Sequence, residues 1–128
     1  MKIIVDAMGG DNAPLEIVKG ALQAQKRFGA AIVFTGDEAA ILDAVRACGL
    51  TALPDGAAVI PTTETVEMCD DPATVFRRKK DTSMGVGLTL LKNGGGDAMV
   101  SAGSTGALLT GATLITKRIH GIRRAAMA

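Results

Sequence analysis

Aromatic side chains are almost absent from this sequence, which has three Phe and neither Tyr nor Trp among its 128 residues. A hydrophobic core must therefore be built from Ala, Val, Ile, Leu and Met. Hydrophobic residues nevertheless make up 48% of the chain and charged residues 21%, which is typical of a folded globular protein rather than a disordered one. The length is sufficient for one domain with its own core.

Cysteine and histidine are also scarce. Cys48, Cys69 and His120 are the only residues of these types, and no Cys-x-x-Cys pair occurs, which argues against a structural zinc site. A thiol nucleophile would need a base beside it, and a single His does not supply that arrangement. Cys48 lies on the apolar stripe of an expected helix and is assigned to the core. The acidic residues between 64 and 71 indicate a solvated loop, so we expect neither a metal nor a cofactor.

The chain has neither a strong charge imbalance nor a long apolar run. Its formal net charge is +1, which gives no general attraction to nucleic acid. The apolar run near the N-terminus is too short for a signal peptide, and no run reaches the length of a membrane span. The sequence thus predicts a cytoplasmic protein that does not have nucleic acid as a partner.

Glycine, in contrast, is abundant, with 16 residues that often stand in clusters. Short apolar runs alternate with helical periodicity between these clusters. The pattern predicts strands at residues 2–5, 30–35, 57–60 and 97–101, and the start of another at 125–128. It predicts helices at residues 14–29, 37–49, 72–78 and 83–92, and a last one from 103 to 117 or 119 that ends at Gly121. Residues 62–82 are densely charged and indicate an excursion from the core. Apolar strands alternating with helices indicate an α/β fold with a parallel sheet covered on both faces.

The first glycine turn, residues 6–14 (Asp-Ala-Met-Gly-Gly-Asp-Asn-Ala-Pro), follows the first expected strand. Open α/β sheets bind ligands beyond the carboxyl ends of their strands. Glycines there let backbone N–H groups approach an anion, and a helix N-terminus adds partial positive charge. The turn lacks the Lys of a P-loop and the Gly-x-Gly-x-x-Gly pattern. A binding site and a structural turn, with Asp11 or Asn12 capping the helix, are equally compatible with it.

The second glycine turn, residues 101–107 (Ser-Ala-Gly-Ser-Thr-Gly-Ala), repeats this arrangement after the fourth expected strand. Three hydroxyl groups and two glycines gather at one helix N-terminus, where they suit a phosphate or a developing oxyanion. The alternative is a hydroxyl-capped helix that packs closely through Gly106 and Gly111. A binding site is favoured because both glycine turns would lie at the same edge of the sheet.

The basic segment, residues 77–83 (Arg-Arg-Lys-Lys-Asp-Thr-Ser), places four cations before small hydroxyl residues. Such a run suits a phosphate or an acidic partner. A solvated charged face explains it equally well. Four adjacent side chains cannot all face one pocket.

These three segments, in this order, resemble the start of the PlsX family of phosphate acyltransferases. Residues 4–14 carry the most specific part of the resemblance. Residues 78–84 resemble the family's basic Lys-Lys-Asp-Ser-Ser stretch, and residues 101–108 resemble its Ser-Ala-Gly-Asn-Thr-Gly-Ala turn, which is similar in phosphate acetyl- and butyryltransferases. Ser104 departs from the usual Asn, Thr82 from the usual Ser, and Ala125 from a Pro. Because family members are much longer, the resemblance is to their N-terminal part.

The resemblance implies a three-layer, Rossmann-like α/β sandwich with a mostly parallel sheet, related to isocitrate and isopropylmalate dehydrogenases. Residues 1–128 would form the N-terminal part of a single acyltransferase domain, without the remainder of the family fold. The implied reaction transfers a fatty acyl group from acyl carrier protein to inorganic phosphate, giving acyl phosphate for phospholipid synthesis. The implied assembly is a homodimer that associates peripherally with the membrane through residues outside this chain.

This reaction needs donors and cations more than a catalytic triad, because phosphate at neutral pH is already an anion. We expect catalytic roles for Lys79, Lys80 and Asp6, with Asp6 or Asp11 orienting a Lys or capping a helix. The residues expected to bind substrate come from all three segments: Gly9, Gly10, Asp11, Asn12, Ser83, Ser101, Gly103, Ser104, Thr105 and Gly106. The alternatives are a phosphotransacetylase-like enzyme that uses acyl-CoA and a non-catalytic anion- or nucleotide-binding fragment.

Overall fold

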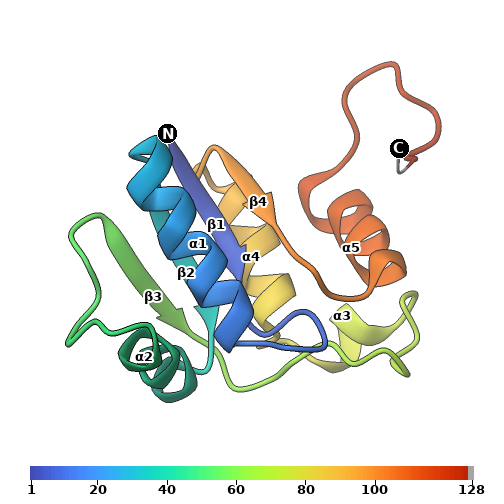
Figure 1. Cartoon of the computed structure of the whole chain (residues 1–128). Coiled ribbons are helices and arrows are strands. Elements are labelled where there is room, and N and C mark those ends of the chain that lie inside the picture. The colour runs from blue at the N-terminus through green and yellow to red at the C-terminus, as the bar shows by residue number, and fades with distance from the viewer. Residues whose placement is uncertain (127–128) are drawn as a thin grey trace.

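Strands and helices alternate along the computed structural model, which describes residues 1–126 (Figure 1). The strands are β1 (Lys2–Asp6), β2 (Ala31–Gly36), β3 (Ala57–Pro61) and β4 (Ala98–Val100). The helices are α1 (Leu15–Phe28), α2 (Glu38–Ala47), α3 (Val75–Arg78), α4 (Ser83–Lys92), α5 (Thr105–Gly111) and the π-helical η1 (Ala112–Thr116). No helix in this part of the chain is long and apolar enough to cross a membrane.

All four strands are parallel, in the order β3-β2-β1-β4. Figure 1 shows α1 and α2 on one face of the sheet and α4 on the other. Parallel strands require crossover connections, which these helices supply. The α/β arrangement expected from the sequence is confirmed, and the bounds of the first four expected strands are correct to within one residue.

The sheet face under α1 and α2 holds the larger apolar cluster. Successive strand residues point to opposite faces, so Val5 of β1 and its partner in register, Phe34 of β2, both enter this cluster. They pack with Val18 of α1 and with Ile41 and Val45 of α2, and all five are at most 6% exposed. Aliphatic residues therefore supply nearly the whole cluster, as the composition requires.

The opposite face depends on close packing of α4 against the sheet. Ile4 of β1 is fully buried there. A Cβ atom on Gly87 of α4 would lie 2.8 Å from Met99 Cε and 3.4 Å from Ile4 Cγ2. Because position 87 has no side chain, α4 can lie directly on β1 and β4.

The polarity of residues 62–82 predicts that this segment leaves the core. This prediction is only partly correct. Glu64 forms an isolated parallel bridge with Thr82, so the segment returns to the rest of the fold. Val66 and Val75 pack with Met84 in a second buried cluster. Val66 and Val75 are therefore core residues that anchor this charged stretch beside the start of α4, whereas Met68 is 79% exposed.

Three details at helix ends differ from expectation. Neither Asp11 nor Asn12 caps α1, which has Pro14 at its N-cap and no side-chain cap. Proline fits the beginning of a helix because the N–H it lacks would have no helical partner there. Cys48 is half-buried at the C-cap of α2 rather than in the core, because the apolar stripe ends with the last turn. The short helix starts at Val75 and not at residue 72.

The C-terminal helix also differs from expectation. It is α-helical only to Gly111 and then continues as η1. It stops at Lys117, whose φ of 71° is left-handed and does not continue a right-handed helix. Gly121 therefore lies beyond the helix rather than ending it. Residues 125 and 126 form no strand, and residues 127 and 128 of the expected strand lie outside the described residues.

Candidate anion-binding site

The two glycine turns meet where the direction of the sheet changes. The chain passes from β1 to β2 on one side, whereas β4 pairs with the other side of β1. The first glycine turn leaves the carboxyl end of β1 and the second leaves that of β4 (Figure 1). Such a switch point is where open α/β sheets bind ligands. The expectation that both turns share one edge of the sheet is confirmed.

The carboxylate of Asp6 joins the two turns. Asp6 ends β1 and is 1% exposed. Its Oδ2 accepts a hydrogen bond from Ser101 Oγ at 2.7 Å, and its Oδ1 accepts one from the Met8 N–H at 3.3 Å. Ser101 Oγ itself accepts from the Gly103 N–H at 3.1 Å. A buried carboxylate is costly unless it is hydrogen-bonded. Asp6 thus orients Ser101 rather than the Lys or helix end expected from the sequence.

Gly9 allows this close approach. A Cβ atom at position 9 would lie 2.7 Å from Asp6 Oδ2, 2.9 Å from Gly103 N and 2.9 Å from Ser101 Oγ. Those distances are too short for a carbon atom, so the contact between the turns requires glycine. Gly10 is left-handed, with a φ of 111°, which also favours glycine. The expected residues Asp6, Gly9, Ser101 and Gly103 therefore form one contiguous cluster, which we call the switch-point cluster.

The start of α4 lies beside the switch-point cluster. Thr82 caps this helix, because its Oγ1 accepts from the Gly85 N–H at 3.1 Å. Met84 Cε lies 3.3 Å from the place that a Cβ atom on Gly103 would occupy. Ser83, between Thr82 and Met84, is 1% exposed, and its hydroxyl has no hydrogen-bond partner. A buried hydroxyl without a partner is unusual in a folded protein, and Ser83 directly precedes Met84, whose side chain extends to Gly103.

The residues that connect the second glycine turn to α5 cap and pack this helix. Ser104 Oγ accepts from the Ala107 N–H at 3.4 Å and caps the helix. Ser shares the capping ability of the Asn that is usual at this position in the family. A Cβ atom on Gly106 would lie 3.2 Å from Pro72 Cγ, so Gly106 allows α5 to approach the 62–82 segment. Thr105 is exposed.

Asp11 and Asn12 are exposed on the loop between Gly10 and α1. The loop holds its shape through backbone hydrogen bonds, from the Ala13 N–H to Gly10 O at 3.3 Å and from the Glu16 N–H to Asn12 O at 3.2 Å. In residues 1–126 neither side chain makes a hydrogen bond to the switch-point cluster. Their expected contact with substrate stays a prediction.

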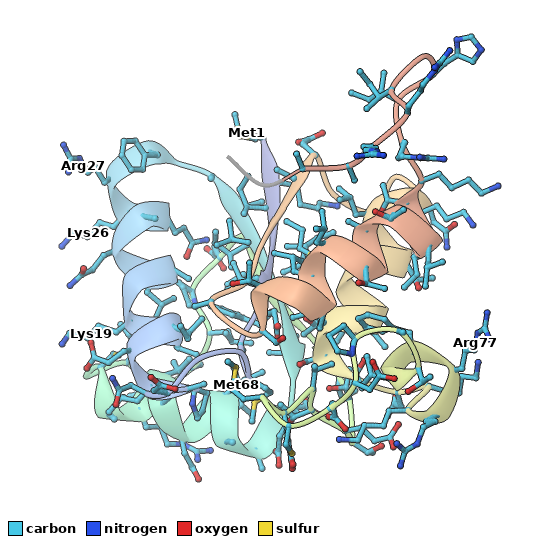
Figure 2. All side chains as sticks on the ribbon, turned by 90° about the vertical axis from the view of Figure 1, so that its right-hand side faces the viewer. Met1, Lys19, Lys26, Arg27, Met68 and Arg77 are labelled. Atoms are coloured by element: carbon cyan, nitrogen blue, oxygen red, sulfur yellow. The ribbon has the colours of Figure 1, made fainter. Side chains whose placement is uncertain are left out.

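The lysines of the basic segment point elsewhere. Lys79 Nζ donates to Asp70 Oδ2 at 2.7 Å and to Thr65 O at 3.1 Å. Lys80 Nζ donates to Phe76 O at 3.4 Å. Figure 2 shows Arg77 of the same segment on the opposite side of the molecule from α1. The structure thus does not bring these ammonium groups to the switch-point cluster, and their catalytic role stays a prediction.

The Lys79–Asp70 ion pair affects both of its partners. The hydrogen bond from the Lys79 ammonium, assisted by one from the Glu67 N–H, lowers the pKa of Asp70 below its ordinary value. The same hydrogen bond raises the pKa of Lys79. With exposed side-chain fractions of 27% for Lys79 and 13% for Asp70, the pair is better shielded than the other ion pairs of the described chain.

Sequence reasoning also missed a polar link that holds the start of α4. Asp81 Oδ2 accepts from the hydroxyl of Thr63 at 2.7 Å and from its N–H at 2.8 Å, and both bonds lower the pKa of Asp81. The Asp81 N–H donates to Glu64 Oε2 at 2.9 Å. These hydrogen-bond partners lie 17 or 18 residues apart in a loop, and no sequence pattern predicts such pairs. The hydrogen bonds are recognised only in the folded structure.

Comparisons with a family model and with curated relatives indicate the same family. The sequence model of the family described as "Fatty acid synthesis protein" matches residues 1–128. The chain is 45% identical over 128 residues to the phosphate acyltransferase of Thermoanaerobacterium thermosaccharolyticum, covering 100% of this chain and 37% of that protein. It is 47% identical over 127 residues to the phosphate acyltransferase of Thermotoga neapolitana, covering 99% of this chain and 35% of that protein.

The chain therefore spans little more than a third of the length of these curated relatives. The match includes all three segments that first indicated the family, because it extends over the whole sequence. The chain belongs to the fatty acid synthesis protein family, whose curated relatives are phosphate acyltransferases.

Proposed function

We propose that the switch-point cluster and the start of α4 bind the inorganic phosphate that accepts an acyl group. The single observation that carries this proposal is the close contact of the two glycine turns at the switch point, where a Cβ atom on Gly9 would lie 2.9 Å from both Gly103 N and Ser101 Oγ. Backbone N–H groups, hydroxyl groups and the partial positive charge of a helix N-terminus suit a phosphate. The printed name of the relatives, phosphate acyltransferase, supports the same substrate.

The chemistry requires a phosphate oxygen to attack the carbonyl carbon of an acyl thioester. The new C–O bond forms as the C–S bond breaks, and the thiolate leaves and takes up the proton that the phosphate loses. Phosphate is already an anion, so the site chiefly has to hold it and stabilise the oxyanion that develops. Ser101 donates its single hydroxyl proton to Asp6 Oδ2 at 2.7 Å, so it would fix the shape of the second glycine turn and leave the donor role to backbone N–H groups of the turns.

For the acyl donor we propose a fatty acyl group on acyl carrier protein, with acyl phosphate as the product for phospholipid synthesis. We further propose that the protein acts in the cytoplasm as a homodimer, with peripheral membrane association through residues outside this chain. These proposals rest on the resemblance of the three segments to the phosphate acyltransferases. Lys79 and Lys80 would then support the site by holding residues 64–83 in place, since their ammonium groups are bonded within that region.

An assay with two alternative acyl donors tests the proposed reaction. It uses the longest protein in which this sequence occurs. Phosphate is supplied with either acyl-[acyl carrier protein] or acetyl-CoA, and the acyl phosphate is trapped with hydroxylamine. The account predicts acyl phosphate from the carrier-protein donor. Product from acetyl-CoA alone would contradict the proposed donor and identify a short-chain phosphotransacylase. Tight nucleotide binding without any acyl transfer would contradict the proposed reaction.

A further inference from the structure

The chain between β3 and α4 connects the carboxyl edge of the sheet to the start of α4. In Figure 1 it leaves the end of β3 and runs along the lower edge of the molecule. The Thr62 N–H donates to Gly36 O, at the end of β2, at 2.9 Å, so the pairing with β2 continues past the end of β3. Glu64 then forms its parallel bridge with Thr82. The start of α4 is therefore tied to the sheet edge from which both glycine turns leave.

Asp81 strengthens this bridge with its side chain. Its Oδ2 accepts from the Thr63 hydroxyl at 2.7 Å and from the Thr63 N–H at 2.8 Å. The backbone of Asp81 bonds Glu64 in both directions, because its N–H donates to Glu64 Oε2 at 2.9 Å and its O accepts from the Glu64 N–H at 3.1 Å. The Ser83 N–H donates to Glu64 O at 3.1 Å. We call Thr63, Glu64 and Asp81 the α4 clamp.

The α4 clamp lies directly before the residues that face the switch-point cluster. Thr82 is fully buried and caps α4 through the Gly85 N–H. Met84 is 1% exposed, and its Cε lies 3.3 Å from the place that a Cβ atom on Gly103 would occupy. Closely packed interiors transmit such displacements. A shift of Asp81 would therefore move the start of α4 relative to the second glycine turn.

We propose that Asp81 is a positioning residue for the phosphate site. By holding Thr63, its carboxylate fixes the start of α4 at the distance from the glycine turns at which both can bind one anion. This inference rests on the proposed function, because it names a residue that shapes the same site. The charge of Asp81 does not itself favour phosphate, since like charges repel. Its contribution comes from the hydrogen bonds that it accepts.

Steady-state kinetics test this role in the longest protein in which the sequence occurs. Asp81→Ala removes the acceptor and should raise the KM for phosphate about threefold to tenfold, the typical effect of one or two lost hydrogen bonds on an equilibrium. The kcat and the KM for the acyl donor should stay unchanged, because the loss concerns phosphate binding. Asp81→Asn keeps an accepting side-chain oxygen without the charge, so its KM for phosphate should be native or lower.

The other partner of the hydrogen bond gives a second, milder set of variants. Thr63 is exposed, so its substitution does not disturb the core. Thr63→Val removes the hydroxyl and should raise the KM for phosphate about twofold or more, whereas Thr63→Ser should keep the native value. The matched control is Thr74→Val. The Thr74 hydroxyl donates to Asp71 Oδ2 at 3.0 Å in the same segment, but this pair lies before α3 and not at α4.

Three results would overturn the positioning role alone. These are a native KM for phosphate in both Asp81→Ala and Thr63→Val, an Asp81→Asn variant as impaired as Asp81→Ala, and an equal rise in KM for Thr74→Val and Thr63→Val. If Asp81→Ala does not fold, the Thr63 variants and Asp81→Asn decide. A native protein whose acyl transfer does not depend on phosphate would contradict the proposed function, and the positioning role with it. The two claims therefore fail in distinguishable ways.

Discussion

At the scale of single residues, the contact between the two glycine turns depends on the absence of a side chain at position 9. The backbone of Gly103, the hydroxyl of Ser101 and the carboxylate of Asp6 all lie within 2.9 Å of the place that a Cβ atom would occupy. These neighbours are backbone atoms or parts of a buried hydrogen-bonded group, so none can move away cheaply.

Gly9→Ala should therefore destabilise the protein by about 1–3 kcal/mol through overpacking. The matched control is Gly20→Ala in α1, where a Cβ atom would meet nothing within 4 Å. That change should stabilise the helix by about 0.5–1 kcal/mol. Urea unfolding of both variants measures the difference. Equal stabilities for the two variants would contradict the close contact between the turns.

Ser101→Ala removes the hydroxyl that bonds Asp6 Oδ2 and leaves that buried oxygen without a partner. The expected loss is about 1–3 kcal/mol of unfolding free energy. Thr113→Val serves as the control, because it removes a hydroxyl that bonds only a helix carbonyl, Leu109 O. A Ser101→Ala variant no less stable than the control in urea would show that Asp6 does not depend on Ser101.

At the scale of elements, the parallel strands and their glycine turns followed from the sequence. Buried parallel strands are continuous apolar runs, and their carboxyl ends share one edge, so the approach of Gly9 to Gly103 was predictable. The partner of Lys79 was not, because Asp70 meets it only after the loop has folded. The free Ser83 hydroxyl was not predictable either, since burial without a partner depends on how α4 packs.

The Lys79–Asp70 pair predicts how pH affects the 62–82 segment. The pKa of Asp70 is lowered from 3.8, so its contribution is present above that value and is lost as the pH falls through the folded-state pKa. The pKa of Lys79 is raised from 10.5, so its contribution is present below that value and is lost as the pH rises through the folded-state pKa. The pair therefore stabilises the protein between these limits.

Urea unfolding at several pH values compares the native chain with Asp70→Asn. The difference in stability should be constant at neutral pH and should shrink as the pH falls below 3.8. Asp43→Asn is the control, because its pair with Arg46 is largely exposed and such pairs contribute little. A native–variant difference that stays the same in acid would contradict the assigned pair.

At the scale of the whole molecule, the sheet described in residues 1–126 has two edge strands, β3 and β4. β4 has β1 as its single strand partner among residues 1–126, and Val100 of β4 is 57% exposed. Leu114, Ile119 and Ile122 are also more than half exposed. A free strand edge with exposed apolar residues favours association.

The chain should therefore elute from gel filtration at an apparent mass that rises with protein concentration. Val100→Lys should reduce that rise, because a charge on an edge strand opposes pairing. Phe28→Lys is the control, since Phe28 is 71% exposed at the end of α1 and away from β4. A monomer at every concentration would contradict this prediction.

Binding of phosphate at the start of α4 tests the central claim most directly. Inorganic phosphate is titrated into the ¹⁵N-labelled chain, and amide shifts are followed. The account predicts saturable shifts at Gly9, Gly10 and Gly103. Ser83→Ala should weaken binding about tenfold or more, as expected for a lost hydrogen bond to a charged group. Thr116→Val, which removes another unpartnered buried hydroxyl, should leave it unchanged. Shifts absent from the glycine turns, or equal affinities for the two variants, would contradict the account.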